Sequence, residues 1–163
     1  MSKFPSKYMV WQAMDAFGNV SKPYISNGTM NQHVYLEECL RKRLLPFILA
    51  HHDIDDILFW PDLASCHYAN IVKEYLNQKN VTFVQKQHNP PNVPQARGIE
   101  MFWAICKQRY HAHPGGAKSL HGFKLIWNRI SKDAAREVGK SCMDHAWRKL
   151  ISIGYKGIRG NHV

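Results

Sequence analysis

Short apolar runs alternate with helical patterns along this chain, and that alternation limits the folds available to it. Residues 8–14, 57–60 and 81–84 are apolar runs bounded by turn residues or charge. Between them, apolar residues recur three and four apart, as on a helix with one buried face. Strands that alternate with helices are typical of an α/β layout with a mixed sheet. We therefore expect a hairpin, helix, strand, helix, strand and loop, followed by helices.

The first part of the chain predicts a β-hairpin and a helix. Residues 8–14 supply one strand, the turn-rich residues 15–19 follow, and residues 20–25 return. A capping pair, Thr29 and Gln32, predicts the start of a helix. That helix is expected to end near Pro46, because proline lacks the N–H that a helix interior needs.

The middle of the chain predicts two strands around a helix. Residues 57–60 suit a central strand buried on both faces, and 81–84 suit a second strand. The intervening helix begins near Ser65. A Pro-rich loop from Asn89 to Pro94 leads into a helix that begins near Gly98.

The end of the chain predicts two further helices after the break His113-Pro-Gly-Gly116. Phe123 and Trp127 belong to the apolar face of the first, and residues 132–152 form the second.

Positive charge is concentrated in the last third of the chain. Residues 1–100 contain ten Lys/Arg against nine Asp/Glu, whereas residues 101–163 contain twelve against three, out of a net charge of +10. A basic face attracts polyanions, because each phosphate contact releases counterions; a merely solvated tail is the alternative. The residues that we expect to track a DNA backbone are Lys118, Lys124, Arg129, Lys132, Arg136 and Lys140.

Two acids stand where α/β proteins place ligands. Asp62 closes the predicted central strand, and Glu100 lies early in the helix after the Pro-rich loop. If they converge, their oxygens suit Mg²⁺ or Mn²⁺, although two carboxylates do not fill the shell of a hard cation. Solvated surface acids are one alternative, and acid–base hydrolysis without metal is another.

The surroundings of both acids resemble Tc/mariner transposases. Phe59 to His67 is similar to the block around the family's second catalytic acid, with a strand ending in Asp and a His five positions on. Asn89 to Trp103 is similar to the block around the third, with a Pro-rich loop, an Ile-Glu pair and a Trp. The resemblance extends over about residues 8–155.

The resemblance implies a ribonuclease-H-like mixed sheet flanked by helices, here with its first strand missing and with a helical C-terminal tail. It makes Asp62 the second acid, Glu100 the third and His67 a neighbour of a Mg²⁺ (or Mn²⁺) site. It further implies cleavage and strand transfer of DNA, at transposon ends and target, in the nucleus. The chain would be one partial catalytic domain, with an α/β core over 8–110 and a basic helical tail over 111–163.

The chain also departs from the family pattern. The first acid belongs to a strand before residues 9–11, where this sequence has almost nothing, and Asp15 lies on the wrong element, in the turn. We therefore expect a fragment that is inactive alone, with a homodimer as a candidate state of the full-length protein. A non-catalytic, basic nucleic-acid-binding remnant of the same fold is the alternative.

The remaining signals are weaker. The four cysteines, Cys39, Cys66, Cys106 and Cys142, have no zinc-ligand spacing and are expected to be buried or half-buried. The cluster of His111, His113 and His121 is expected in a surface loop rather than a metal site. Trp60, Trp103, Trp127 and Trp147 are candidates for base stacking, with core packing favoured for Trp103 and Trp127. The sequence contains neither a run of ~18 apolar residues nor a signal-peptide pattern, so we expect an intracellular protein.

Overall fold

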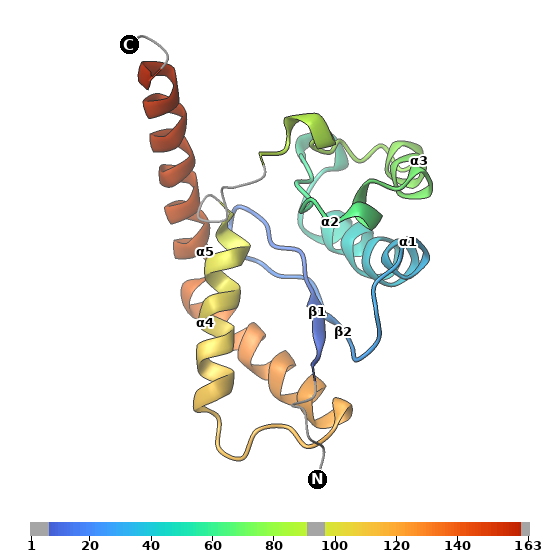
Figure 1. Ribbon diagram of the computed structural model, residues 1–163, viewed down its shortest axis with the longest axis vertical. Coiled ribbons are helices and arrows are strands. Elements are labelled where there is room, and N and C mark those ends of the chain that lie inside the picture. Colours follow the sequence, from blue (N-terminus) through green and yellow to red (C-terminus); the bar gives the residue numbers. More distant parts are fainter. Residues whose placement is uncertain (1–6, 91–96, 161–163) are drawn as a thin grey trace. The chain divides into compact units, whose positions relative to one another are not determined.

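The computed structural model describes the backbone of residues 7–90 and 97–160, and their side chains as far as residue 152. These residues belong to two compact units (Figure 1). The described part of unit 1 is residues 7–13 and 21–90, and that of unit 2 is residues 14–20 and 97–160.

A two-stranded antiparallel sheet opens unit 1. Strands β1 (Met9–Trp11) and β2 (Tyr24–Ser26) pair with Val10 opposite Ile25. The Ser21 hydroxyl accepts a hydrogen bond from the Ala13 backbone N–H at 2.9 Å, which continues the pairing beyond the strands. The hairpin predicted for residues 8–25 is thus confirmed in its strand pairing.

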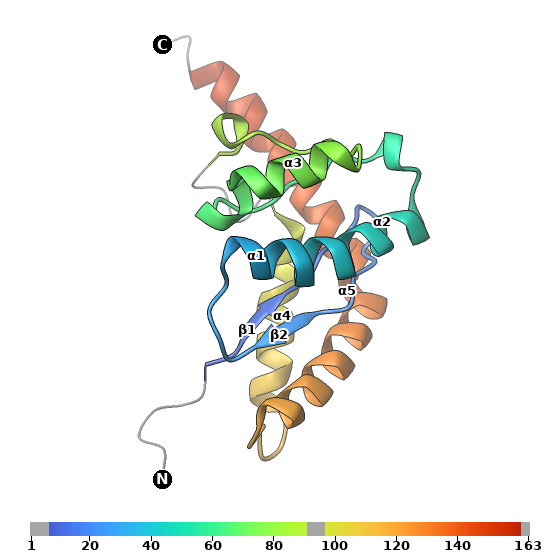
Figure 2. The ribbon, with the colours of Figure 1, turned by 90° about the vertical axis from the view of Figure 1, so that its right-hand side faces the viewer.

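A continuous helix follows the sheet and supplies much of the core. It comprises α1 (Gln32–Val34), the wider π-type helix η1 (Tyr35–Leu44) and α2 (Leu45–His51), seen end to end in Figure 2. The N-cap is Asn31 rather than the predicted Thr29, since its side-chain oxygen accepts the N–H groups of His33 and Val34.

The prediction that this helix ends near Pro46 is wrong. Pro46 lies in the first turn of α2, where a missing N–H costs little, and the helix continues to His51.

The rest of unit 1 is one further helix, which packs against this long helix, and several short ones. Its short helices are η2 (Ile54–Asp56), η3 (Ser65–Tyr68) and η4 (Lys86–His88), and α3 (Asn70–Gln78) lies beside η1. The core includes residues of η1 and of α3, namely Tyr35, Leu40, Val72, Tyr75 and Leu76.

The predicted ribonuclease-H-like mixed sheet is wrong. Most described residues are helical, and their only named sheet has two antiparallel strands. Residues 57–60 and 81–84 meet at a single parallel bridge, Phe59 with Phe83. A four-residue run with so few ladder partners cannot bury both of its faces, and the Leu58 side chain is accordingly 62% exposed.

Unit 2 is built from two helices that pack side by side. Helix α4 (Gly98–Ala112) ends before the turn that contains Gly115 and Gly116, both with positive φ, and α5 (Leu120–Gly160) follows. The break predicted at residues 113–116 is confirmed. The two predicted tail helices are instead one, because no proline interrupts residues 120–160.

The turn that follows the first strand belongs to unit 2 and packs on α5. Gly18 adopts a φ of +86°, and its backbone touches α5 at Gly139 and Lys140. Asp15 organises this turn, since its carboxylate accepts the N–H groups of Phe17 and Asn19 at 3.0 and 2.9 Å. Asp15 is therefore a turn-forming residue, as its sequence position indicates.

Candidate functional site

Asp62 follows the segment that pairs with residues 81–84. The Phe59 N–H donates to the carbonyl of Thr82 at 2.8 Å, and the Phe59 carbonyl accepts from the Val84 N–H at 2.9 Å. Chain direction and pairing therefore resemble a parallel strand end, although only one residue pair forms the bridge. The Asp62 side chain is 56% exposed.

His67 connects Asp62 to the core of unit 1. Its Nδ1 lies 2.6 Å from a carboxylate oxygen of Asp62, which also accepts the Ala64 N–H at 2.8 Å. The imidazole is buried and stacks on the Tyr35 ring with centroids 3.9 Å apart. Burial, with smaller contributions from Cys39 and from the Asp62 charge, raises the pKa of Tyr35 well above its ordinary value. The structure thus brings together the two residues that the resemblance placed side by side.

A buried asparagine, which sequence reasoning missed, holds the chain just before Asp62. The Asn89 side chain accepts from Trp60 Nε1 and donates to the Pro61 carbonyl, both at 2.7 Å. It also donates to the Tyr68 hydroxyl at 3.0 Å, and that hydroxyl donates to the Val84 carbonyl at 2.8 Å. The only signal in the sequence is an asparagine at the start of a Pro-rich stretch, which is usual for loops.

Glu100 lies in the first turn of α4, as predicted, and is exposed. Its backbone N–H donates to the Arg97 carbonyl at 3.1 Å. Glu100 belongs to unit 2 whereas Asp62 belongs to unit 1. Most of the predicted Pro-rich loop, residues 91–96, lies outside the described residues.

The acids of the described residues do not fit a divalent metal. Over residues 7–90 and 97–152, no three His, Cys, Asp or Glu side chains gather as a metal site would require. The Oδ1 oxygen of Asp62 already contacts His67 Nδ1 and accepts the Ala64 N–H. A single engaged carboxylate is not the oxygen shell that Mg²⁺ or Mn²⁺ requires.

A row of cations follows one side of α5. Arg129, Lys132, Arg136 and Lys140 are all exposed and follow one another at intervals of three and four residues, which places them on one stripe of the helix. We call these four residues the basic stripe. Of the other predicted phosphate contacts, Lys118 precedes α5 and Lys124 lies on another side of it; both are exposed.

The opposite side of α5 explains why this stripe faces solvent. Phe123, Trp127, Ile130 and Ala134 are buried, and Phe123 stacks on Trp127 with centroids 5.6 Å apart. A helix with one buried apolar face presents its remaining face to water. Core packing, as predicted for Trp127, therefore orients the basic stripe.

The cations of the stripe are only loosely engaged within the protein. Arg136 lies 3.5 Å from Asp133, and Lys140 lies 3.0 Å from Asp144, in exposed pairs one helical turn apart. Such pairs contribute little and are easily exchanged. Within the described part of the chain, Arg129 and Lys132 form no salt bridge. All four side chains can therefore turn towards a polyanion.

Exposed apolar side chains flank the basic stripe along α5. Leu125 is 60% exposed one turn before Arg129, and beside it lies a hollow of about 140 Å³ lined also by His113. Trp147 is 63% exposed and Ile151 is 55% exposed beyond Lys140.

The other tryptophans that are candidates for base stacking are less available than Trp147. Trp127 is buried, while Trp60 and Trp103 are half-buried. Core packing is confirmed for Trp127, and Trp103 is partly covered.

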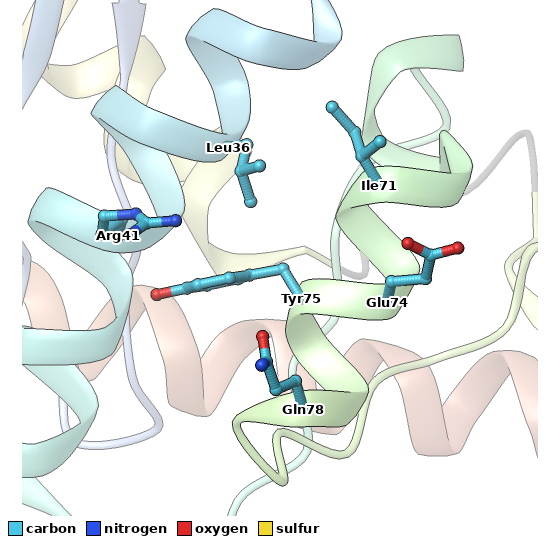
Figure 3. A pocket seen from close by; sticks show the side chains of 6 residues that line it. All are labelled: Leu36, Arg41, Ile71, Glu74, Tyr75 and Gln78. Carbon is cyan, nitrogen blue, oxygen red and sulfur yellow. The ribbon is translucent and has the colours of Figure 1, made fainter.

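Unit 1 contains an open groove between η1 and α3 (Figure 3). Its volume is about 480 Å³, and Leu36, Ile71, Glu74 and Gln78 line it together with Arg41 and Tyr75. The Arg41 guanidinium lies 5.4 Å from the centroid of the Tyr75 ring and pairs with Glu37 at 3.0 Å. With its cation already paired and a Glu in its wall, the groove is not suited to a polyanion.

The cysteines lie as expected, whereas the predicted surface loop holds only one of the three tail histidines, His113. Cys39, Cys106 and Cys142 are buried free thiols, and Cys66 is a half-buried one. His111, His113 and His121 are exposed at the end of α4, after it and at the start of α5.

No protein-family model and no curated protein matches this chain. In the described residues, no helix combines the length and the apolar character that crossing a membrane would require.

Proposed function

We propose that this chain is a nucleic-acid-binding protein derived from the catalytic region of a Tc/mariner transposase, and that it binds the phosphate backbone of DNA. The observation that carries the proposal is the basic stripe of α5. Four exposed cations within a dozen residues extend over about 16 Å of helix, enough to contact several successive phosphates. Their partner would be nuclear DNA, as the resemblance to transposases implies.

Charge distribution supports DNA more than a small anion as the ligand. The four cations of the basic stripe follow a single helix face and are not gathered in a pocket, so they suit a long, regularly charged partner. Phosphate contacts of this type position a protein on DNA without reading its sequence. We therefore expect binding with little sequence preference.

Fluorescence anisotropy with a labelled duplex of about 20 base pairs at increasing NaCl tests this proposal. The slope of log affinity against log salt should be about −3 to −4, since each phosphate contact contributes about 0.9. The double variant Arg129→Gln/Lys132→Gln should reduce that slope by about two. Lys22→Gln/Lys86→Gln is the matched control, because it removes two exposed cations of unit 1 and should leave the slope unchanged.

Two outcomes would contradict phosphate binding along α5. The first is an affinity that does not depend on salt. The second is an equal reduction of the salt slope by both double variants. That result would assign binding to the overall net charge instead of the basic stripe.

Metal-dependent strand cleavage, the activity that the resemblance implies, is a second candidate. Asp62 favours it, since this acid follows a segment with one parallel bridge, at Phe59, and contacts a buried histidine. The described acids do not complete a metal shell, so this candidate needs further ligands.

Nicking of supercoiled plasmid in Mn²⁺ tests this candidate. If the chain nicks DNA, Asp62→Ala should abolish the activity, whereas Asp55→Ala, which removes another exposed acid of unit 1, should retain it. Nicking that survives Asp62→Ala would refute a role for this acid, and nicking that survives EDTA would favour acid–base hydrolysis without metal.

A further inference from the structure

Trp147 is an exposed aromatic residue in line with the basic stripe. It follows Lys140 by seven residues, which is two turns of α5 and about 11 Å along its axis. The ring is 63% exposed, and Ile151, one turn further, is 55% exposed. Residues four apart on a helix are neighbours on its surface, so Trp147 and Ile151 form one exposed apolar patch, and such patches are typical of interaction sites.

Trp147 does not hold α5 in its unit. Cys142 and Ala146 occupy the buried side of this part of the helix, and both are almost fully buried. The next two residues, Arg148 and Lys149, are exposed cations. Because side chains one or two positions apart on a helix do not face each other, these two cations point to other sides of α5, and the ring lies at the end of the basic stripe, two turns beyond Lys140.

We infer that Trp147 stacks on an unpaired base of a single nucleic-acid strand whose backbone runs along the basic stripe. This inference rests on the proposed function, because the stripe must first hold the phosphates. Aromatic rings beside a basic track are how proteins bind single strands, since every base offers a π face. In duplex DNA the bases are paired and stacked, so the ring would gain nothing there.

The surface around Trp147 and Ile151 suits a second copy of this chain less well than it suits a nucleic-acid strand. A two-fold contact through Trp147 and Ile151 would bring the same surface of both copies together. Such a contact would also bring the two strongly basic tails close together, and like charges across an interface are unfavourable. A polyanion neutralises those charges instead.

Anisotropy with labelled dT15 and with a duplex of equal length, at equal salt, tests the inference. Trp147→Ala should weaken binding of dT15 about tenfold or more and leave duplex binding unchanged. Trp147→Phe, which keeps a ring, should retain most of the affinity. Leu125→Ala is the matched control, because it removes an equally exposed apolar residue from the other end and should have little effect.

The salt slope separates stacking from charge. Trp147→Ala should leave the slope for dT15 unchanged, since no phosphate contact is lost, whereas Arg129→Gln/Lys132→Gln should lower it. The inference is overturned if Trp147→Ala binds dT15 as the parent chain does, or if dT15 and duplex lose affinity equally. It is also overturned if Trp147→Ala converts a dimer to a monomer in sedimentation. A parent chain that binds neither probe would refute the proposed function itself.

Discussion

At the scale of single residues, Gly18 shows how closely the turn meets α5. A Cβ atom at this position would overlap the backbone of Gly139 and Lys140, and the backbone φ is already +86°. A side chain would therefore meet both backbone strain and a steric clash with a rigid helix.

We expect Gly18→Ala to lower the free energy of unfolding by about 2 kcal/mol or more, measured by urea denaturation. Gly115→Ala is its control, because Gly115 has a similar φ of +79° but a Cβ atom there would have nothing within 4 Å. In that control, the free energy of unfolding should fall only by the amount that the strained backbone costs. If both variants lose the same free energy of unfolding, the contact of Gly18 with α5 contributes nothing to stability.

Asp62 and His67 show what residue patterns can establish. The sequence places a histidine five positions after the acid, and the structure has their side chains in contact at 2.6 Å. It also predicts Glu100 in the first turn of a helix, which is where it lies. The role of Asn89 escapes prediction, because its three partners come from segments up to 29 positions away.

At the scale of elements, α5 is the largest departure from expectation. The periodicity predicts a separate helix over residues 132–152, yet Leu120–Gly160 is continuous. Periodicity reveals the apolar residues of both stretches but contains no signal for a break between them, since residues 120–160 lack proline.

Lys132→Pro distinguishes one helix from two. Proline is tolerated at the first position of a helix, so a helix beginning at residue 132 would accept it. In the interior of α5 it removes a hydrogen bond and should cost about 3 kcal/mol of stability, with a loss of helical circular dichroism. His121→Pro is the control, because residue 121 lies in the first turn of α5 and should accept proline at little cost. A parent-like melt of Lys132→Pro would contradict the continuous helix.

The predicted strands differ from the predicted helices in where their backbone hydrogen-bond partners lie. A helix satisfies its backbone hydrogen bonds within one segment, whereas a strand depends on neighbours from elsewhere in the chain. Residues 57–60 have the composition of a buried strand but meet only the segment around Phe83, so no larger sheet forms among the described residues.

At the scale of the whole molecule, each unit has a core of its own, and each core contains buried thiols. Burial raises the pKa of Cys39 in unit 1 to about 12 and that of Cys106 in unit 2 to about 11, from an ordinary value of 9.0. Folding thus disfavours both thiolates.

Stability should therefore fall as pH rises above 9. Below pH 9 the thiols are protonated in both folded and unfolded chains, so they add no pH dependence; between pH 9 and about 12 only the unfolded chain ionises readily, which favours unfolding. Urea denaturation at about pH 8, 9 and 10 measures the trend. The variant Cys39→Ala/Cys106→Ala should show a shallower decline, and an identical decline would assign the effect to other groups.

The sequence by itself determined the hairpin, the helices α3 and α4, the break at residues 113–116 and the concentration of cations in the last third. These features depend on neighbours a few positions apart, on turn residues and on charge, all of which can be seen locally. Only the tertiary structure decided that the apolar runs do not build a mixed sheet and that the tail is one helix. It also decided that four of six predicted cations share a stripe with Trp147 beyond it. Those outcomes depend on which segments meet and which helix face is buried, and packing between distant residues decides both.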